Sequence, residues 1–375
     1  MMDYTAFSRS MVGQSHAVRG QGCEDSSIHY CDPGNRFAIA ALCDGISDEK
    51  CFRSAKGARF GCQSAVIILR NLMEAYLEEE DPAGVEKLLS RKQTVLDRVR
   101  RGILQSWSTM VEADLAEHPI TEAEYQRLRQ SRSGQQAEAV YRAGKRLHDV
   151  YGATFLAAAV CEQFHIALHI GDGILIRLEG DGRYTAPLPY DPRNDTPSPA
   201  ALCHEDLLRR EFAFRGELFP GAPQAVFVMC DGVADMPLSV DACLELLEIQ
   251  KRMMERSGAE KPGLRELNRE QAEYLDTFLD YHTHHDAADD CSICGIFHNT
   301  QVVAALSLTR DELSQEYQVL EENRKEEARV YQRRLSVIQK KLSEDNRQLS
   351  ELEERRRLLE RQIRETQAVL RANNG

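Results

Sequence analysis

Apolar and polar residues occur in blocks along this 375-residue chain, and the blocks have two different periods. The run FAIAALC at residues 37–43 is apolar throughout and ends at an Asp-Gly pair, which is typical of a strand buried on both faces. Similar runs predict further strands at residues 154–161, 164–170, 174–178, 225–230 and 291–297. The first three of these are separated by tight turns, which indicates an antiparallel meander.

Helical periodicity occupies the stretches between the strands. Residues 55–77 place Ala65, Leu69 and Met73 on one face of a helix, and charge-rich helical sequence continues to about residue 148. Further helical blocks are predicted at 240–256 and 264–282, and a proline-rich stretch at 187–199 predicts an irregular surface loop. Clusters of strands and clusters of helices, without strict alternation, indicate an α+β fold.

A heptad pattern begins near residue 309 and continues to the end of the chain. The apolar residues of its seam are Ala328, Tyr331, Leu335, Ile338, Leu342, Leu349, Leu352, Leu359, Ile363 and Leu370. Asp345, Arg356 and Thr366 are polar residues on the same seam. The pattern predicts a coiled-coil helix of about 60 residues, roughly 90 Å long. We therefore expect a globular domain at 1–308, with a helical insertion at about 80–150, and a coiled coil at 309–375.

Composition limits the partners and the cellular compartment that we expect for this protein. The net charge of −13 opposes binding to nucleic acid and to anionic membranes, so we expect neither partner. No stretch is apolar enough to span a bilayer, and no signal peptide is evident at the start. Most of the 11 cysteines lie in apolar runs, as buried free thiols do in a reducing compartment. We expect a cytoplasmic protein.

Acidic residues recur at the edges of the apolar runs. They are Glu24 and Asp25, Asp44, Asp172, Asp231 and Asp235, and Asp289 and Asp290. Carboxylates that gather raise one another's pKa, so a fold that unites them needs cations. A ligand set made only of oxygen atoms favours Mg²⁺ or Mn²⁺ over zinc.

A single Asp-Gly pair is usually a plain turn, but the ordered set of motifs is more specific. The motifs are GCEDS at 22–26, LCDG at 42–45, YGAT at 151–154, GDG at 171–173, MCDGVAD at 229–235 and DDCS at 289–292. Together, across roughly residues 8–297, they resemble the metal-dependent type 2C protein serine/threonine phosphatases. The opening GQSH at 13–16 is most similar to a bacterial branch.

The resemblance implies a four-layer α-β-β-α sandwich, with two antiparallel sheets flanked by helices. The heptad pattern adds the long C-terminal coiled-coil helix that follows it. It implies two Mg²⁺ or Mn²⁺ ions, with a third as an additional expectation. The implied direct ligands of the two ions are Asp44, which bridges them, the Gly45 carbonyl, Asp231 and Asp289. Glu24 and Asp25 would act mainly through metal-bound waters. Asp172 and Asp235 would join Asp231 at the third ion. Asp290 is the alternative to Asp289, although the spacing to Ser292 favours Asp289.

The implied activity is hydrolysis of phosphoserine or phosphothreonine by attack of a water that bridges two metal ions. Asp44, Asp231, Glu24 and Asp25 would carry it. Arg19 is the candidate phosphate-binding arginine, with Arg9 as a weaker alternative. His16 is either the acid that protonates the leaving oxygen or a surface or capping histidine. The implied substrate is a phosphoprotein that a partner kinase modifies.

Several alternatives stay open. A catalytically inactive phosphatase-like scaffold could act through its coiled coil, which could pair with itself, bind another helix or fold back as a hairpin. His282, His284 and Asp286 resemble the start of a metallo-β-lactamase metal motif, but Ala287 stands where the next histidine is expected. The inserted helices at 80–150 are either a docking element or peripheral packing.

Overall fold

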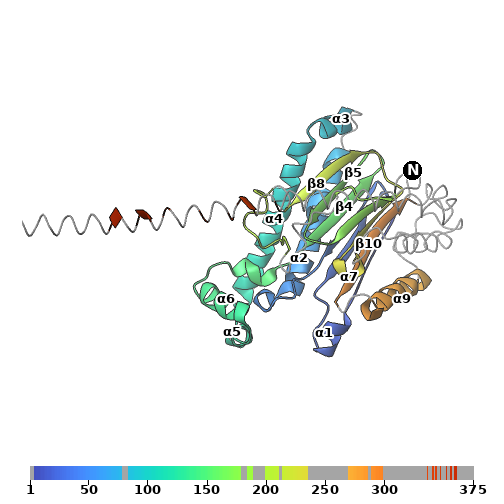
Figure 1. Cartoon of the computed structure of the whole chain (residues 1–375). Helices are drawn as coiled ribbons and strands as arrows, with labels where there is room; N and C mark the ends of the chain where they lie inside the picture. Colours follow the sequence, from blue (N-terminus) through green and yellow to red (C-terminus); the bar gives the residue numbers. More distant parts are fainter. Residues whose placement is uncertain are drawn as a thin grey trace, which may run out of the picture. The chain divides into compact units, whose positions relative to one another are not determined.

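The structure is a computed structural model of the whole chain (Figure 1). It describes residues 4–77, 83–178, 184–188, 199–210, 213–234, 269–285, 289–298 and ten single positions between 336 and 360. The chain divides into two compact units, Met1–Tyr317 and Gln318–Gly375. Within the described residues, no helix is long and apolar enough to cross a membrane.

Two antiparallel five-stranded sheets form the centre of the first unit. Sheet A has the order β1 (Tyr4–Met11), β10 (Cys291–His298), β9 (Ala225–Met229), β6 (Ile174–Leu178) and β7 (Tyr184–Thr185). Sheet B has the order β2 (Ser26–Cys31), β3 (Phe37–Cys43), β4 (Phe155–Cys161), β5 (Phe164–Ile170) and β8 (Arg215–Pro220). The apolar runs predicted most of the central strands, whereas β1, β2 and β8 have mixed patterns that the sequence did not mark.

The predicted meander is wrong at its third strand. β4 and β5 pair as an antiparallel hairpin in sheet B, but β6 pairs with β7 and β9 in sheet A. The turn at 171–173 therefore carries the chain from one sheet to the other. Gly171 has a φ of +106° there, a conformation that suits glycine. When both faces of a strand are apolar, its sequence does not indicate which of the two sheets it joins.

Alternate side chains of β3 face two different hydrophobic cores. Ile39 and Ala41 lie in the core beneath the helices, while Ala38 and Ala40 lie in the core between the two sheets. All seven residues of β3 are buried. This double burial explains why the run at 37–43 lacks any polar residue.

Helices cover the outer face of each sheet (Figure 1). α2 (Ser54–Leu77) and α4 (Lys92–Glu117) lie on sheet B, and α9 (Arg269–His285) lies on β1 and β10 of sheet A. The shorter helices are α1 (Gln14–Val18), η1 (Glu49–Cys51), α3 (Ala83–Ser90), α5 (Glu122–Leu128), α6 (Arg132–Arg142), η2 (Leu147–Tyr151) and α7 (Asp231–Ala234). The predicted pair of antiparallel sheets flanked by helices is confirmed.

The predicted helical insertion contains two kinds of helix. α4 buries Val99, Ile103 and Trp107 in the core over sheet B, and the Trp107 Nε1–H donates to the Gly57 carbonyl of α2 at 3.0 Å. α4 is therefore part of the layer that covers this sheet. α5 and α6 instead pack on each other and on η1.

Some predictions fall outside the described residues. They include the helix at 240–256, most of the proline-rich loop and most of the coiled coil. The described positions between 336 and 360 are all helical. Of the predicted seam, Leu352 is 63% exposed and Leu359 is 51% exposed.

Candidate metal site

Three acids from three strand ends meet at one end of the two sheets. Asp25 directly precedes β2 and Asp44 directly follows β3, and the register Ser26↔Cys43 places these two ends side by side. Asp231 follows β9 and is the first residue of α7. The charge of Asp231 acts on Asp44 across the space between the two sheets.

The electrostatics of this cluster disfavour three bare carboxylates. Removal from water raises the pKa of Asp44 well above its ordinary value, and the charges of Asp25, Asp231 and Asp172 raise it further. Burial raises the pKa of Asp25 to about 7, the charge of Asp290 adds to the rise, and the Ser292 hydroxyl partly offsets it. Both Asp25 carboxylate oxygens are buried and lack a well-formed hydrogen bond to any described residue. Cations would supply the missing partners.

The backbone around Asp44 is held rigidly. The Asp44 N–H donates to Thr154 Oγ1 at 3.1 Å, and the Asp44 carbonyl accepts from the Thr154 N–H at 2.8 Å. A Cβ atom on Gly45 would lie 2.5 Å from the Glu24 carbonyl oxygen, so only glycine fits beside Glu24. These contacts assign a structural role to the motifs at 42–45 and 151–154.

Asp289 and Asp290 have different environments. The buried Asp290 carboxylate accepts the N–H of Gly13 at 2.7 Å through Oδ1 and the N–H of Glu24 at 2.6 Å through Oδ2. The Asp289 side chain is 56% exposed, and its Oδ1 accepts the Asp290 N–H at 2.9 Å. Asp290 therefore bonds two backbone amides, while Asp289 is the more exposed of the two acids; the preference for Asp289 as a ligand stays a prediction.

His16 is not a surface histidine, so that alternative is wrong. Its side chain is 2% exposed, with Nδ1 3.0 Å from Asp290 Oδ1 and Nε2 3.1 Å from Ser47 Oγ. The ligand atoms of His16, Asp289 and Asp290 lie within 4.8 Å of one another. No local pattern places a histidine from 13–16 beside the closing motif, since the contact depends on β1 pairing with β10.

Ser47 joins His16 to Glu24, and the sequence analysis missed it. Its hydroxyl donates to Glu24 Oε2 at 2.9 Å. Burial raises the pKa of Glu24, and the Ser47 hydrogen bond acts against this rise. No motif marks Ser47, because its role arises from the loop after Gly45 folding back over Glu24.

The two candidate phosphate-binding arginines do not contact the acids. Arg19 is exposed, and its guanidinium donates to the carbonyl and hydroxyl of Ser15 on its own helix at 3.0 and 3.4 Å. The Arg9 guanidinium pairs with Asp276 on α9 at 3.2 Å. Within the described part of the chain, neither guanidinium bonds a carboxylate of the cluster.

The remaining predicted residues lie partly outside the described ranges. Asp172 sits in the turn at 171–173, and its charge acts on Asp44. Asp235 is not among the described residues, nor are Asp286 and the side chain of His284. His282 packs in a T-shaped contact on Phe278 with 4.6 Å between ring centroids, so its ring serves helix packing within α9.

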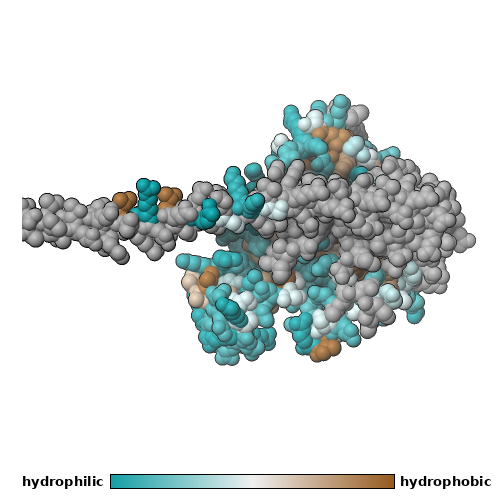
Figure 2. Space-filling view, in the orientation of Figure 1, coloured by the Kyte–Doolittle hydropathy of each residue, from teal (hydrophilic) through white to brown (hydrophobic). Residues whose placement is uncertain are grey.

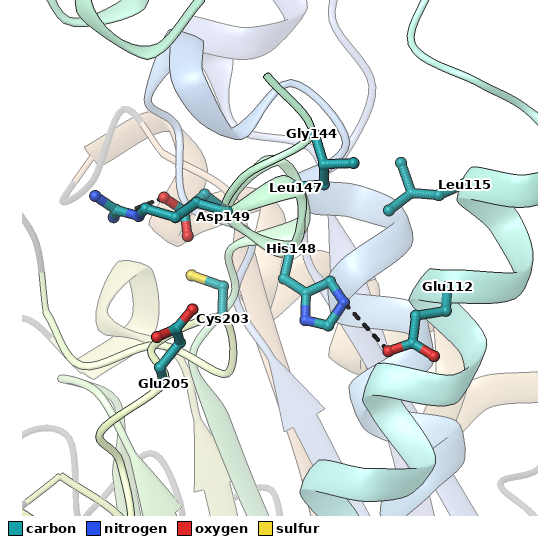
Figure 3. Close-up of a pocket in the computed structure, with 9 residues that line it drawn as sticks. Glu112, Leu115, Gly144, Leu147, His148, Asp149, Cys203 and Glu205 are labelled. Carbon is teal, nitrogen blue, oxygen red and sulfur yellow. Dashed lines mark ion pairs between the residues drawn. The ribbon is translucent and has the colours of Figure 1, made fainter. Parts of the chain in front are cut away.

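A cavity of about 360 Å³ lies away from the acids (Figure 3). Its wall consists of Glu112 and Leu115 of α4, Gly144, Arg146, the η2 residues Leu147, His148 and Asp149, and Cys203 and Glu205. The His148 ring faces Glu112, with 3.7 Å between Nε2 and Oε1. None of the predicted site residues lines this cavity, so the acid cluster stays the candidate site.

Comparisons with known proteins identify the family of the chain. The family model described as Protein phosphatase 2C matches residues 12–279. A search of curated proteins finds no significant match.

Solved structures with a similar fold have low sequence identity to the chain. One is PppA, a key regulatory component of the type VI secretion system in Pseudomonas aeruginosa, with 16% identity, a TM-score of 0.42, and coverage of 79% of this chain and 98% of that one. Another is the catalytic domain of the phosphatase PstP with two manganese ions, at 18% identity, a TM-score of 0.43, and coverage of 80% and 99%. A third is Stp1 from Staphylococcus aureus, at 13% identity, a TM-score of 0.41, and coverage of 79% and 95%.

Proposed function

Because the chain belongs to the protein phosphatase 2C family, we propose that it is a metal-dependent phosphatase that hydrolyses phosphoserine and phosphothreonine in a protein substrate. The observation that carries the proposal is the convergence of Asp25, Asp44 and Asp231, with both buried Asp25 oxygens lacking a well-formed hydrogen bond to any described residue. The substrate we propose is a phosphoprotein that a partner kinase modifies.

The residues fit Mg²⁺ or Mn²⁺, since all the ligands we propose are oxygen atoms. We propose Asp44 as the ligand shared by two ions, with the Gly45 carbonyl, Asp231 and Asp289 completing their shells. Glu24 and Asp25 would accept hydrogen bonds from metal-bound waters. Asp172 and Asp235, with Asp231, are the proposed ligands of a third ion.

Bound divalent cations supply a water of lowered pKa and neutralise charge on the phosphoryl oxygens. The side chains around these cations would orient the groups that take part in the hydrolysis. Asp290 Oδ1 lies 3.0 Å from His16 Nδ1, and His16 Nε2 lies beside Ser47 and Asp289. We propose that His16 donates the proton to the leaving serine or threonine oxygen from Nε2.

Release of phosphate from a phosphothreonine peptide tests this function. We expect wild-type protein to require Mn²⁺ or Mg²⁺, and Asp231→Asn to lower kcat by at least 100-fold while the protein stays folded. Asp97→Asn is the matched control, because Asp97 is an exposed acid on α4 that pairs with Arg100. Wild-type protein with no more activity than Asp231→Asn would favour the inactive scaffold.

We also propose that the C-terminal heptads pair with a second copy of the chain. Leu352 and Leu359 are seven residues apart on the predicted seam, and both are more than half exposed in the single chain. A parallel or antiparallel partner helix would cover such positions.

A further inference from the structure

The hairpin of α5 and α6 is anchored beside the candidate site. The Ser133 hydroxyl donates to Asp48 Oδ1 at 3.3 Å, and the Tyr141 hydroxyl donates to the Lys50 carbonyl at 3.3 Å. Asp48 directly follows Ser47 and is four residues from Asp44, so it lies within about 14 Å of that acid. The hairpin thus packs on the loop that leads out of the acid cluster.

A buried arginine fixes this arrangement. Arg53 is 8% exposed, and its guanidinium donates to both Glu124 oxygens at 3.0 and 3.2 Å and to the His118 carbonyl at 2.8 Å. The capping box between Thr121 and Glu124 starts α5 at the same point. These bonds hold the hairpin in one position relative to the loop at 47–53.

The hairpin is basic, although the protein is acidic. Residues 122–142 contain four arginines against three glutamates, and Lys145 and Arg146 follow α6, while the chain has a net charge of −13. All three glutamates are paired: Glu122 with Arg142, Glu138 with Arg129 and Arg142, and Glu124 with Arg53. Figure 2 shows a mostly hydrophilic surface over this lobe.

Arg146 pairs with Asp149 at 2.6 Å, which leaves three exposed cations in this segment. Arg127, Arg132 and Lys145 form no ion pair with any described residue. Arg127 lies at the end of α5 and Arg132 opens α6, so both flank the turn next to Ser133. This turn is also the part of the hairpin that contacts Asp48.

We propose that the turn between α5 and α6 is a docking surface for acidic residues that flank the phosphorylated residue of the substrate. The inference rests on the proposed phosphatase function and names the substrate class that suits it. An acidic phosphoprotein is repelled by the molecule as a whole, so a fixed positive surface beside the site is where such a chain gains attraction.

The kinetics of two phosphothreonine peptides test this proposal on the full-length, Mn²⁺-loaded protein. One peptide carries aspartates and glutamates on both sides of the phosphothreonine, and the other carries lysines there. For the acidic peptide, we expect the double variant Arg127→Glu, Arg132→Glu to raise KM roughly tenfold with kcat unchanged. The KM for the basic peptide and the rate with p-nitrophenyl phosphate should not rise.

A matched control separates local docking from overall charge. The double variant Arg91→Glu, Arg101→Glu makes the same change in net charge at exposed positions of the α4 region. Arg91 precedes α4, whereas the chain reaches α5 only after the far end of this helix. We expect the control to change the KM for the acidic peptide less than twofold. An equal rise in both double variants, or no rise in either, would overturn the proposal.

Peptide binding tests the proposed docking surface independently of catalysis. Fluorescence anisotropy of the labelled acidic phosphopeptide should show weaker binding to the Arg127, Arg132 variant than to the control variant, with or without turnover. Absence of activity in every variant would remove the phosphatase function while this comparison still reports on the surface. Equal competition by a single-stranded oligonucleotide would overturn an acidic peptide as the specific occupant.

Discussion

Asp290 connects three segments that are far apart in the sequence. Its carboxylate accepts the N–H groups of Gly13 and Glu24 and lies 3.0 Å from the His16 ring. A buried carboxylate that satisfies two backbone donors is a structural element, since buried N–H groups without partners are costly. The closing motif therefore supplies one acid for the candidate metal site and one for its framework.

Replacement of Asp290 should reveal this structural role. Asp290→Ala leaves the buried Gly13 amide and the part-buried Glu24 amide without this acceptor, and we expect a loss of about 3 kcal/mol in the free energy of unfolding. Asp290→Asn keeps one acceptor oxygen and should lose about half as much. Urea denaturation measures both, and an Ala variant as stable as the Asn variant would contradict the role.

The raised pKa of Asp25 predicts a pH dependence of stability in the metal-free protein. The folded protein holds a proton on Asp25 up to about pH 7, whereas the unfolded chain releases it near its ordinary value of 3.8. The folded state therefore binds more protons in this window, and the contribution of Asp25 to stability is lost as the pH rises from about 4 to about 7. The loss has an upper bound of about 4 kcal/mol.

Thermal unfolding in the presence of a chelator checks this dependence. We expect wild-type Tm to fall between pH 5 and pH 8, and Asp25→Asn to flatten that fall. Added Mn²⁺ should raise the wild-type Tm more at pH 8 than at pH 5, because protons and cations compete for the same oxygens. A parallel decline in both proteins would assign the pH dependence to other groups.

At the scale of elements, one ionic network joins α2, α4, α5 and η2. Arg53 precedes α2, and its guanidinium meets Asp114 of α4 at 3.4 Å and the Tyr151 hydroxyl of η2 at 2.7 Å. Lys56 also bonds Asp114, at 2.8 Å. The pKa of Asp114 is lowered because these cations and the Tyr151 hydroxyl outweigh its burial.

Loss of Arg53 should loosen the helices that follow α4. Arg53→Gln removes the charge that balances Asp114 and Glu124, and we expect a loss of about 2 kcal/mol, since the pairs are only partly buried. Hydrogen exchange should then rise in α5 and α6 more than in β3 and β4. Arg70→Gln, which breaks the exposed pair with Glu74 on α2, should leave exchange in α5 and α6 unchanged.

At the scale of the whole molecule, the second unit predicts an assembly. Lysines at the seam positions, in the double variant Leu352→Lys, Leu359→Lys, should prevent pairing and lower the mass seen by light scattering from two chains to one. The control Ser336→Lys, Ser343→Lys adds the same charges with the same spacing at exposed positions off the seam. A wild-type mass of one chain would exclude a homodimer.

Local patterns predicted much of the first unit correctly. β3 and β4 are apolar because both faces are buried, and α2 places Ala65, Leu69 and Met73 in the core as its periodicity indicates. The Asp-Gly pair after β3 predicted a turn with an acid at a strand end. These features depend on residues near one another in the chain, so their pattern is visible in the sequence.

The sequence by itself determined the buried central strands, the layer helices and the set of acids, since each rests on local periodicity or on motif chemistry. The tertiary structure alone decided which acids meet, that β6 joins sheet A, and that Ser47, His16 and Asp290 form one cluster. It also decided that the basic turn at Arg127 and Arg132 packs beside the candidate site. Such contacts depend on which distant segments pair in the sheets. Hydrophobic burial drives that pairing, but it is non-directional, so a local sequence pattern does not show which segments will meet.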